Sequence, residues 1–182
     1  TPKVMGVLNL TPDSFFDGGK FLRKDNSFDE SKIINSIESM IEDGADFIDI
    51  GAQSTKPGFT KISPSEELDR LGLVFDKLND YPVLFSIDTF NYEVIKEAIN
   101  KKIDLINNVF SFSDQDCFKL VCRNDVPICV CHQGNPDNKE DIFSQINLFF
   151  SDVEEKFEKE KFNTDNITVS YTHLRAHETY TY

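Results

Sequence analysis

The sequence predicts an α/β fold, and within that class an incomplete (β/α)8 barrel. Short apolar segments of strand length alternate with segments of helical periodicity, and the links between them are short. This is the pattern of a parallel sheet built from βα units. A closed barrel of eight units needs about 250 residues. Because this chain has 182 residues, we expect about five of the eight βα units to be present.

The predicted strands are short runs rich in β-branched and other apolar residues, bounded by turn-forming residues. They cover residues 4–10, 47–51, 83–88, 105–109 and 128–131. A doubly wound sheet would have a glycine-rich phosphate loop after its first strand. The segment at residues 11–20 lacks that pattern, which favours the barrel.

The predicted helices carry apolar residues three or four positions apart, so that each has one apolar face. They cover residues 29–43, a helix that begins at Ser63, and residues 91–101, 114–122 and 139–161. The run Ser63-Pro64-Ser65-Glu66 is typical of a capping box with proline at the first helical position. Gly44 is expected to end the first helix.

The charge and hydropathy of the chain argue against several classes of partner. The formal net charge of −13 argues against nucleic acid and against an anionic membrane surface. No apolar run approaches the roughly 20 residues that span a bilayer, and the run at residues 4–10 is too short for a signal peptide. We therefore predict a cytoplasmic protein with no nucleic acid and no membrane as partner.

The four cysteines do not form a recognised metal-binding pattern. Cys117, Cys122, Cys129 and Cys131 contain no CxxC pair, and zinc sites need cysteine or histidine at characteristic spacings. We expect these thiols to be reduced and buried, because cytosolic proteins rarely form disulfides. A zinc site is the alternative.

The end of the chain departs from the alternating pattern. A sixth strand is due near Ile167, but the residues that follow are polar and aromatic, without an apolar run. The run VSYTHLRAHET (residues 169–179) resembles one reading frame of a transposase-based sequencing adapter. We therefore predict that residues 168–182 are an artefactual tail, which is left out of fold reasoning. A genuine exposed tail, or His173 and His177 as a ligand pair, are the alternatives.

Polar residues gather at the predicted carboxyl ends of the strands, where a (β/α)8 barrel places its catalytic loops. They are Asn9, Asp49, Asp88 and Asn107, from the first, second, third and fourth strands. Asn9 and Asn107 could instead hold turns, and Asp88 could cap a helix. A buried carboxylate such as Asp49 needs a partner, so a structural partner is the alternative to a catalytic role. Together, at consecutive strand ends, they predict one site.

Two longer motifs make the interpretation specific. VMGVLNLTPDSFFDGG (residues 4–19) and GADFIDIGAQSTKPG (residues 44–58) closely resemble the first two signatures of the dihydropteroate synthase family. SIDTF, LINN and HQGNP resemble the ends of that family's third, fourth and fifth strands. The resemblance covers about residues 4–161. It implies a TIM barrel, of which residues 1–167 would be a partial, pterin-binding portion.

The resemblance implies a transferase of folate biosynthesis. Such an enzyme condenses 7,8-dihydropterin pyrophosphate with p-aminobenzoate and gives 7,8-dihydropteroate and pyrophosphate. Cleavage of the carbon–oxygen bond runs ahead of amine attack, so the departing pyrophosphate needs stabilisation by Mg²⁺ and by fixed hydrogen-bond donors. The resemblance also implies a homodimer.

The resemblance assigns roles to the residues at matching positions. Asn9 is expected to bind Mg²⁺ and to act in catalysis with Asp49, beside the reacting centre. Asp88 and Asn107 are expected to bind the pterin, whose ring presents both donors and acceptors. The other predicted substrate-binding residues are Thr55 for the phosphates, Phe15 and Pro57 for p-aminobenzoate, and Thr11 and Lys56.

The chain departs from the family pattern at four matched positions, the first of which is Ala52 in place of a glycine. Gln53 replaces a glutamate, Lys56 an arginine and Asn108 an aspartate. A catalytically dead pterin-binding homologue is therefore one alternative. A pterin-binding methyltransferase domain is another, which the loop at residues 9–15 disfavours. Because the family's later strands are absent, we expect a fragment that alone is inactive and poorly folded, with open strand edges.

Overall fold

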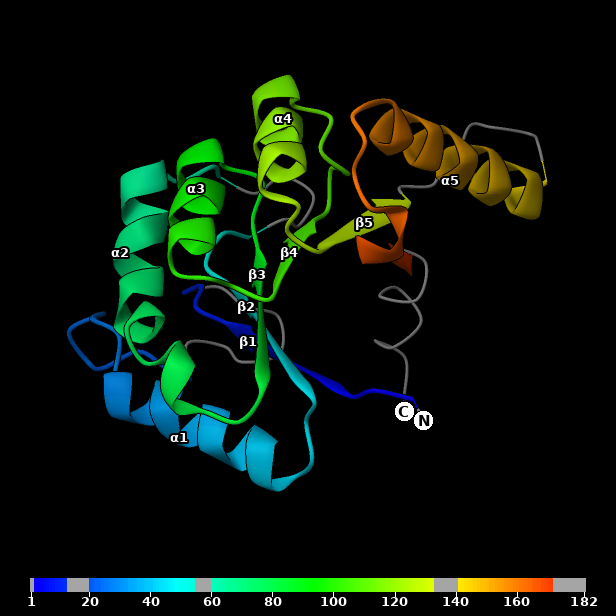
Figure 1. Cartoon of the computed structure of the whole chain (residues 1–182). Helices are drawn as coiled ribbons and strands as arrows, with labels where there is room; N and C mark the ends of the chain where they lie inside the picture. Colours follow the sequence, from blue (N-terminus) through cyan, green and yellow to red (C-terminus); the bar gives the residue numbers. More distant parts are fainter. Residues whose placement is uncertain (1, 13–19, 55–59, 133–140, 172–182) are drawn as a thin grey trace. The chain divides into compact units, whose positions relative to one another are not determined.

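The computed structural model describes residues 2–12, 20–54, 60–132 and 141–171. Along this part of the chain, six strands alternate with helices, which confirms the predicted α/β class (Figure 1). The chain divides into two compact units, Thr1–Asn107 and Asn108–Tyr182. None of the helices in the four described ranges is both long and apolar enough to span a membrane.

In the first unit, four strands pair in parallel in the order of the chain. They are β1 (Met5–Asn9), β2 (Phe47–Gly51), β3 (Leu84–Asp88) and β4 (Leu105–Asn108), whose last residue begins the second unit. The connecting helices are α1 (Glu30–Glu42), α2 (Pro64–Phe75), the short 3-10 helix η1 (Leu78–Asp80) and α3 (Tyr92–Asn100). Figure 1 shows α1, α2 and α3 on one side of these strands.

The ends of the helices follow the predicted signals. Ser63 Oγ accepts a hydrogen bond from the Glu66 backbone N–H at 3.1 Å, so Ser63 is the N-cap of α2 as expected. Gly44 follows the end of α1 with a φ of +93°, a left-handed conformation that costs glycine little. Its N–H donates to the Ile41 carbonyl at 3.0 Å, which occupies one of the last free carbonyls of α1.

The two faces of the first unit's sheet differ in composition. Side chains on one face are completely buried beside the helices, namely Leu8, Ile48, Ile50, Ile87 and Ile106. Because successive side chains alternate between faces, the register places Met5, Val7, Asn9 and the residues paired with them on the opposite face. There Met5 is 41% exposed, Val7 52% and Leu84 44%. The first face forms the core, and the second carries exposed apolar side chains together with the predicted polar site.

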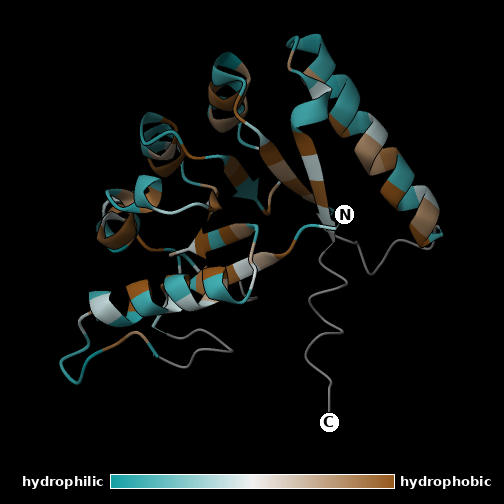
Figure 2. Cartoon of the chain, turned by 60° about the horizontal axis from the view of Figure 1, so that its bottom comes forward, coloured by the Kyte–Doolittle hydropathy of each residue, from teal (hydrophilic) through white to brown (hydrophobic). Residues whose placement is uncertain are grey.

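Figure 2 shows that the helices also carry both apolar and polar residues, because brown and teal segments alternate along their length. Ile33 and Ile37 of α1 and Val94, Ile95 and Ala98 of α3 are buried, as the helical spacing predicts. Gly6 in β1 allows α1 to approach closely, because a Cβ there would lie 2.8 Å from Met40 Sδ. The apolar stripes thus hold the helices against one face of the strands.

The second unit contains α4 (Gln115–Asn124), β5 (Ile128–His132), α5 (Ile142–Lys159), the 3-10 helix η2 (Thr164–Asn166) and β6 (Ile167–Tyr171). An aromatic cluster forms its core around Phe157, whose ring centroid lies 4.9 Å from that of Phe118 and 5.0 Å from that of Phe162. Edge-to-face and tilted contacts of this kind add to the stability that burial supplies. Strands β5 and β6 pair in parallel, with Val130 opposite Val169.

Strand β6 lies where a sixth strand was due, although no continuous apolar run follows Ile167. Ile167, Val169 and Tyr171 alternate with Thr168 and Ser170, which is the period-two pattern of a strand with one apolar face. The artefactual tail at residues 168–182 stays a prediction, and residues 172–182 lie outside the described residues. His173 and His177 lie outside the described residues.

The buried cysteines agree with the prediction for Cys117, Cys129 and Cys131, whereas Cys122 is only half-buried. Burial raises the pKa of the Cys117 thiol to about 12 and that of Cys122 to about 11. Both groups therefore carry their proton at neutral pH and are poor nucleophiles and metal ligands in this state. Within the described ranges, no three His, Cys, Asp or Glu side chains gather as a metal-binding group.

Candidate functional site

The predicted polar residues meet at the carboxyl ends of the strands in the first unit. The parallel register pairs Asn9 with Gly51, Gly51 with Asp88, and Asp88 with Asn107. These four residues therefore form one row across β1, β2, β3 and β4. Residues in register share a face, so their side chains project from the sheet face that the core helices do not cover.

Gly51 leaves an open space in the middle of this row. A Cβ on residue 51 would lie 3.4 Å from Asn9 Oδ1 and 3.7 Å from Asp88 Oδ2. The amide oxygen of Asn9 and the carboxylate of Asp88 thus both lie near the point where a side chain on residue 51 would begin. The sequence prediction did not include Gly51, although a glycine at the last position of a buried strand can indicate a close approach.

Asn107 of the row pairs with Asp49, a buried carboxylate that lies beneath the row. Asn107 Nδ2 donates a hydrogen bond to Asp49 Oδ2 at 2.9 Å, and only 3% of Asp49 and 5% of Asn107 is exposed. Asp49 lies two residues before Gly51, on the same face of β2. The structural partner expected for Asp49 is therefore Asn107, which is itself a predicted site residue. The hydrogen bond thus satisfies the buried carboxylate within the predicted site.

Of the remaining predicted residues, Thr11 lies in the described part of the chain and four others lie outside it. Thr11 is buried just beyond β1, next to Leu10, whose N–H donates to the Gly51 carbonyl at 2.7 Å. The other four predicted substrate-binding residues lie outside the described residues, namely Phe15, Thr55, Lys56 and Pro57.

Gln53 occupies a position that bridges two backbone segments. Its Nε2 donates to the Ser54 carbonyl at 2.9 Å and to the Thr60 carbonyl at 3.4 Å, and its Oε1 accepts from the Ile62 N–H at 2.9 Å. An ionised glutamate could not donate these bonds. The substitution therefore has a local structural role, which sequence motifs alone do not indicate.

Asn108 and His132 also have local partners within the second unit. Asn108 Oδ1 accepts hydrogen bonds from the N–H groups of Phe110 at 2.9 Å and Phe112 at 3.4 Å, so it holds the turn after β4. An aspartate could accept the same two bonds. The buried His132 ring lies edge-to-face with Phe149, with their centroids 5.2 Å apart.

The site at the strand ends suits a small polar ligand and a hard cation. Amide and carboxylate oxygens are the protein ligands that Mg²⁺ prefers, and Mg²⁺ keeps several of its waters. Asn9 Oδ1 and the Asp88 carboxylate both lie near the Gly51 position, and either oxygen could bind such an ion. The Asp49–Asn107 pair offers a carboxylate and an amide to a heterocycle with both donors and acceptors.

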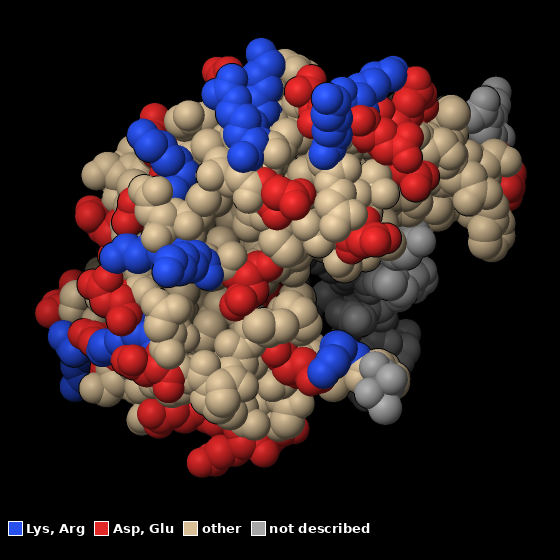
Figure 3. Space-filling view, viewed as in Figure 1, with Lys and Arg blue, Asp and Glu red and all other residues tan. Residues whose placement is uncertain are grey.

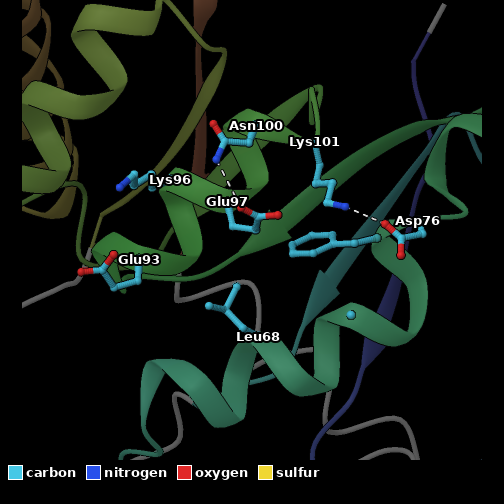
Figure 4. Close-up of a pocket in the computed structure, with 9 residues that line it drawn as sticks. Leu68, Asp76, Glu93, Lys96, Glu97, Asn100 and Lys101 are labelled. Carbon is cyan, nitrogen blue, oxygen red and sulfur yellow. Dashed lines mark hydrogen bonds and ion pairs between the residues drawn. The ribbon is translucent and has the colours of Figure 1, made fainter.

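A groove of about 490 Å³ lies between α2 and α3, and it contains none of the predicted site residues. Figure 4 shows Lys101 of this groove paired with Asp76, with 2.6 Å between Nζ and Oδ1. On the face seen in Figure 3, acidic side chains lie interspersed with Lys and Arg. Exposed pairs of this kind contribute little to stability, and the mixed charge of the groove does not single out a ligand.

Known proteins are similar to this chain in sequence. A family model described as "Pterin binding enzyme" matches residues 5–176. The mitochondrial folate synthesis bifunctional protein of Arabidopsis thaliana is 45% identical over 148 residues, which cover 76% of this chain and 26% of that protein. The dihydropteroate synthase of Clostridium beijerinckii is 40% identical over 139 residues, which cover 75% of this chain and 49% of that protein.

The fold also matches solved structures. The structure of Yersinia pestis dihydropteroate synthase with a sulfonamide drug complex aligns with a TM-score of 0.80 and 32% identity. The alignment covers 92% of this chain and 62% of that chain. This chain therefore spans half or less of the two named curated relatives and somewhat more of the solved structure.

Proposed function

Because this chain belongs to the pterin-binding enzyme family and carries part of the dihydropteroate synthase barrel, we propose that the protein containing it is a dihydropteroate synthase. It would condense 7,8-dihydropterin pyrophosphate with p-aminobenzoate. The observation that carries the proposal is the row of Asn9, Gly51, Asp88 and Asn107 above the buried Asp49. This row places two carboxylates, two amides and an open space at the end of a barrel where catalysis takes place.

The pterin ring is assigned to the side of the row formed by β2, β3 and β4. Asn107 donates to Asp49 through Nδ2, so its Oδ1 is the atom that would accept a pterin N–H. The carboxylates of Asp49 and Asp88 would accept hydrogen bonds from the ring N–H and amino groups. Hydrogen bonds to ionised acceptors are about twice as strong as those between neutral groups.

The pyrophosphate is assigned to the side of the row formed by β1. Asn9 would hold Mg²⁺, which when bound neutralises charge on the leaving pyrophosphate. Thr55 would contact the phosphates, Phe15 and Pro57 the p-aminobenzoate ring, and Lys56 would bind substrate. These four assignments rest on the sequence motifs.

The reaction forms one bond and breaks one. The amine nitrogen of p-aminobenzoate bonds to the exocyclic methylene carbon of the pterin, and the carbon–oxygen bond to pyrophosphate breaks. The electron pair of that bond leaves with pyrophosphate, and the amine loses its proton to the surrounding solvent. As this bond breaks, positive charge develops on the pterin. The carboxylates of Asp49 and Asp88 would stabilise that charge from fixed positions.

The location and assembly of the protein stay predictions. The composition favours the cytoplasm, whereas the Arabidopsis thaliana relative is named as mitochondrial. The homodimer is implied by the family resemblance alone.

The proposal is tested by turnover of the full-length gene product with the pterin pyrophosphate, p-aminobenzoate and Mg²⁺. We expect dihydropteroate to form, and we expect Asn9→Ala to reduce kcat at least about 10-fold, because it removes a fixed oxygen beside the leaving group. The control is Asn100→Ala on the helix α3, which removes an amide remote from the row. Pterin binding without turnover in the wild-type protein would favour the catalytically dead homologue. An Asn9→Ala variant with unchanged kcat would remove Asn9 from the mechanism.

A further inference from the structure

Helix α2 sends two charged side chains toward the strand ends of the first unit, and neither takes part in the proposed chemistry. They are Glu67, which is completely buried, and Arg70, whose side chain is 13% exposed. Charged groups are rarely buried unless they are paired or hydrogen-bonded. Their partners therefore indicate what these two residues do.

Arg70 binds the backbone immediately after two residues of the row. Its Nη1 donates to the Ala52 carbonyl at 2.8 Å and lies 3.5 Å from the Leu10 carbonyl. Ala52 follows Gly51, and Leu10 follows Asn9. One guanidinium thus joins the ends of β1 and β2.

The guanidinium is itself held in place. Its Nη2 donates to Glu66 Oε1 at 2.7 Å, and its Cζ lies 5.8 Å from the centroid of the Phe28 ring. A rigid planar fork can serve the two carbonyls and Glu66 at once, whereas a lysine ammonium is a single point of charge on a flexible stem. The identity of the side chain therefore matters as well as its charge.

Glu67 binds two side chains of the turn that immediately follows Asp88. Its Oε1 accepts from Thr89 Oγ1 at 2.6 Å, and its Oε2 accepts from Asn91 Nδ2. The Thr89 N–H in turn donates to the Asn107 carbonyl at 3.0 Å. One carboxylate thus holds the end of β3 and, through Thr89, its alignment with β4.

We infer that Glu67 and Arg70 are positioning residues that fix the strand ends carrying Asn9, Asp88 and Asn107. Arg70 sets the β1 and β2 side of the row, and Glu67 sets the β3 and β4 side. The consequence for ligand binding rests on the proposed function, because it uses the assignment of pyrophosphate to Asn9 and of pterin to Asp88 and Asn107. The contacts themselves do not depend on that assignment.

The positions of these strand ends matter because Asn9 and Asp88 leave room for only about one methyl group beside Gly51. A displacement of about 1 Å can reduce the rate of an enzyme about 100-fold. Loss of the Arg70 fork would release Asn9 and Gly51 together, without touching the bonds that Glu67 makes. The two residues should therefore produce separable defects.

The first part of the test is hydrogen exchange of backbone amides, measured by NMR in the full-length gene product. In Arg70→Lys, we expect the Leu10 amide to exchange about 10-fold faster and the Thr89 amide to be unchanged, because local opening follows the loss of local bonds. In Glu67→Gln, we expect the reverse. Restricted rotation of the Arg70 guanidinium in the wild-type protein, measured by ¹⁵N NMR, tests the fork without any variant.

The second part compares two ligands in the presence of Mg²⁺, hydroxymethyl-dihydropterin with and without its pyrophosphate. Arg70→Lys should weaken binding of the pyrophosphate-bearing ligand about 10-fold and binding of the other ligand much less. The reason is that the substitution displaces the end of the row that carries Asn9. Glu67→Gln should weaken binding of both ligands to the same extent. A general loss of stability would not produce this difference between ligands.

Matched controls are Asp69→Asn on the exposed side of α2 and Arg123→Lys on α4, and both should behave as the wild type. The inference is overturned if exchange at Leu10 and Thr89 is unchanged in both variants, or if both variants accelerate both amides equally. It is also overturned if wild-type pterin binding is normal and neither variant alters it. Absence of pterin binding in the wild type would instead refute the proposed function, while the exchange data would still decide the positioning role.

Discussion

The two faces of the first unit's sheet use the same strands for different purposes. On the covered face, Ile50 and Ile87 are completely buried beside the helices. On the opposite face, one residue further along each strand, Gly51 and Asp88 belong to the polar row. Because side chains alternate along a strand, neighbouring residues belong to a region that stabilises the fold and to a region that binds ligands. The comparison predicts that substitutions one residue apart have different kinds of effect.

The largest expected effect comes from the covered face. Ile87→Ala should lower the free energy of unfolding by about 2–5 kcal/mol, because it removes buried apolar contacts and leaves a cavity. Urea unfolding of the full-length gene product measures this loss. A change below about 0.5 kcal/mol, as for an ordinary surface substitution, would contradict the assignment of Ile87 to the core.

The adjacent residue should show the opposite pattern. Asp88→Asn should weaken pterin binding about 10- to 100-fold, because hydrogen bonds to a charged group contribute about 1.5–3 kcal/mol. It should change the unfolding free energy much less than Ile87→Ala does. Calorimetric titration with the pterin, together with urea unfolding, separates the two quantities. Normal affinity with reduced stability would place Asp88 in the framework and not in the site.

A third substitution tests the open space between Asn9 and Asp88. Gly51→Ala places a methyl group at ordinary contact distance from both residues, so folding should tolerate it. Replacing a glycine without strain can even add about 0.4–1 kcal/mol to stability. We nevertheless expect weaker binding of the pterin pyrophosphate with Mg²⁺, because the methyl group occupies the space beside Asn9 Oδ1.

The control for that substitution is Ile50→Val, which trims the covered face at the preceding residue. It should cost about 0.5–1.5 kcal/mol of stability and leave binding unchanged. If Gly51→Ala binds the ligand with wild-type affinity, the space in front of Gly51 is not part of the site.

The smallest expected effect is a pH dependence of stability that originates from Glu67 on α2. Burial raises the pKa of Glu67 above its ordinary value, against the lowering effect of hydrogen bonds from Thr89 and Asn91 and of the charges of Lys61 and Arg70. The folded state therefore holds this proton more tightly than the unfolded state. The stabilisation is complete below the ordinary pKa of glutamate, near 4.5, and is lost as the pH rises through the folded-state pKa.

Unfolding measured across this pH range in the wild type and in Glu67→Gln tests the prediction. The plot of unfolding free energy against pH should be less steep in the glutamine variant, because the contribution of Glu67 is lost. Asp69→Asn, on the exposed side of α2, should retain the wild-type slope. Equal slopes in the wild type and Glu67→Gln would show that the Glu67 proton does not contribute.

Local patterns were sufficient to predict most of the fold. The described strands and helices lie within a few residues of the predicted ranges, because periodicity and capping signals such as Ser63 act over short distances. Strand β6 was harder to recognise, because its alternating pattern includes polar residues and does not form an apolar run. The chain was correctly expected to be α/β before any pairing was known.

The contacts within the site depend on the register of distant strands. Asp49 and Asn107 were both predicted as site residues, but their hydrogen bond joins positions 58 residues apart, and sequence spacing does not reveal it. The space around Gly51 and the bonds of Glu67 and Arg70 likewise appear only when β1, β2 and β3 are aligned. Motifs thus identified the residues, while the sheet determines how they act together.

The central claim is that the row at the strand ends binds a pterin, and side-chain amide NMR tests it most directly. In the full-length gene product, adding hydroxymethyl-dihydropterin should shift the side-chain amide signals of Asn107. Adding its pyrophosphate with Mg²⁺ should also shift those of Asn9, while Asn100 on α3 stays unchanged. If both ligands leave Asn9 and Asn107 unchanged, or shift Asn100 alone, the row is not the pterin site.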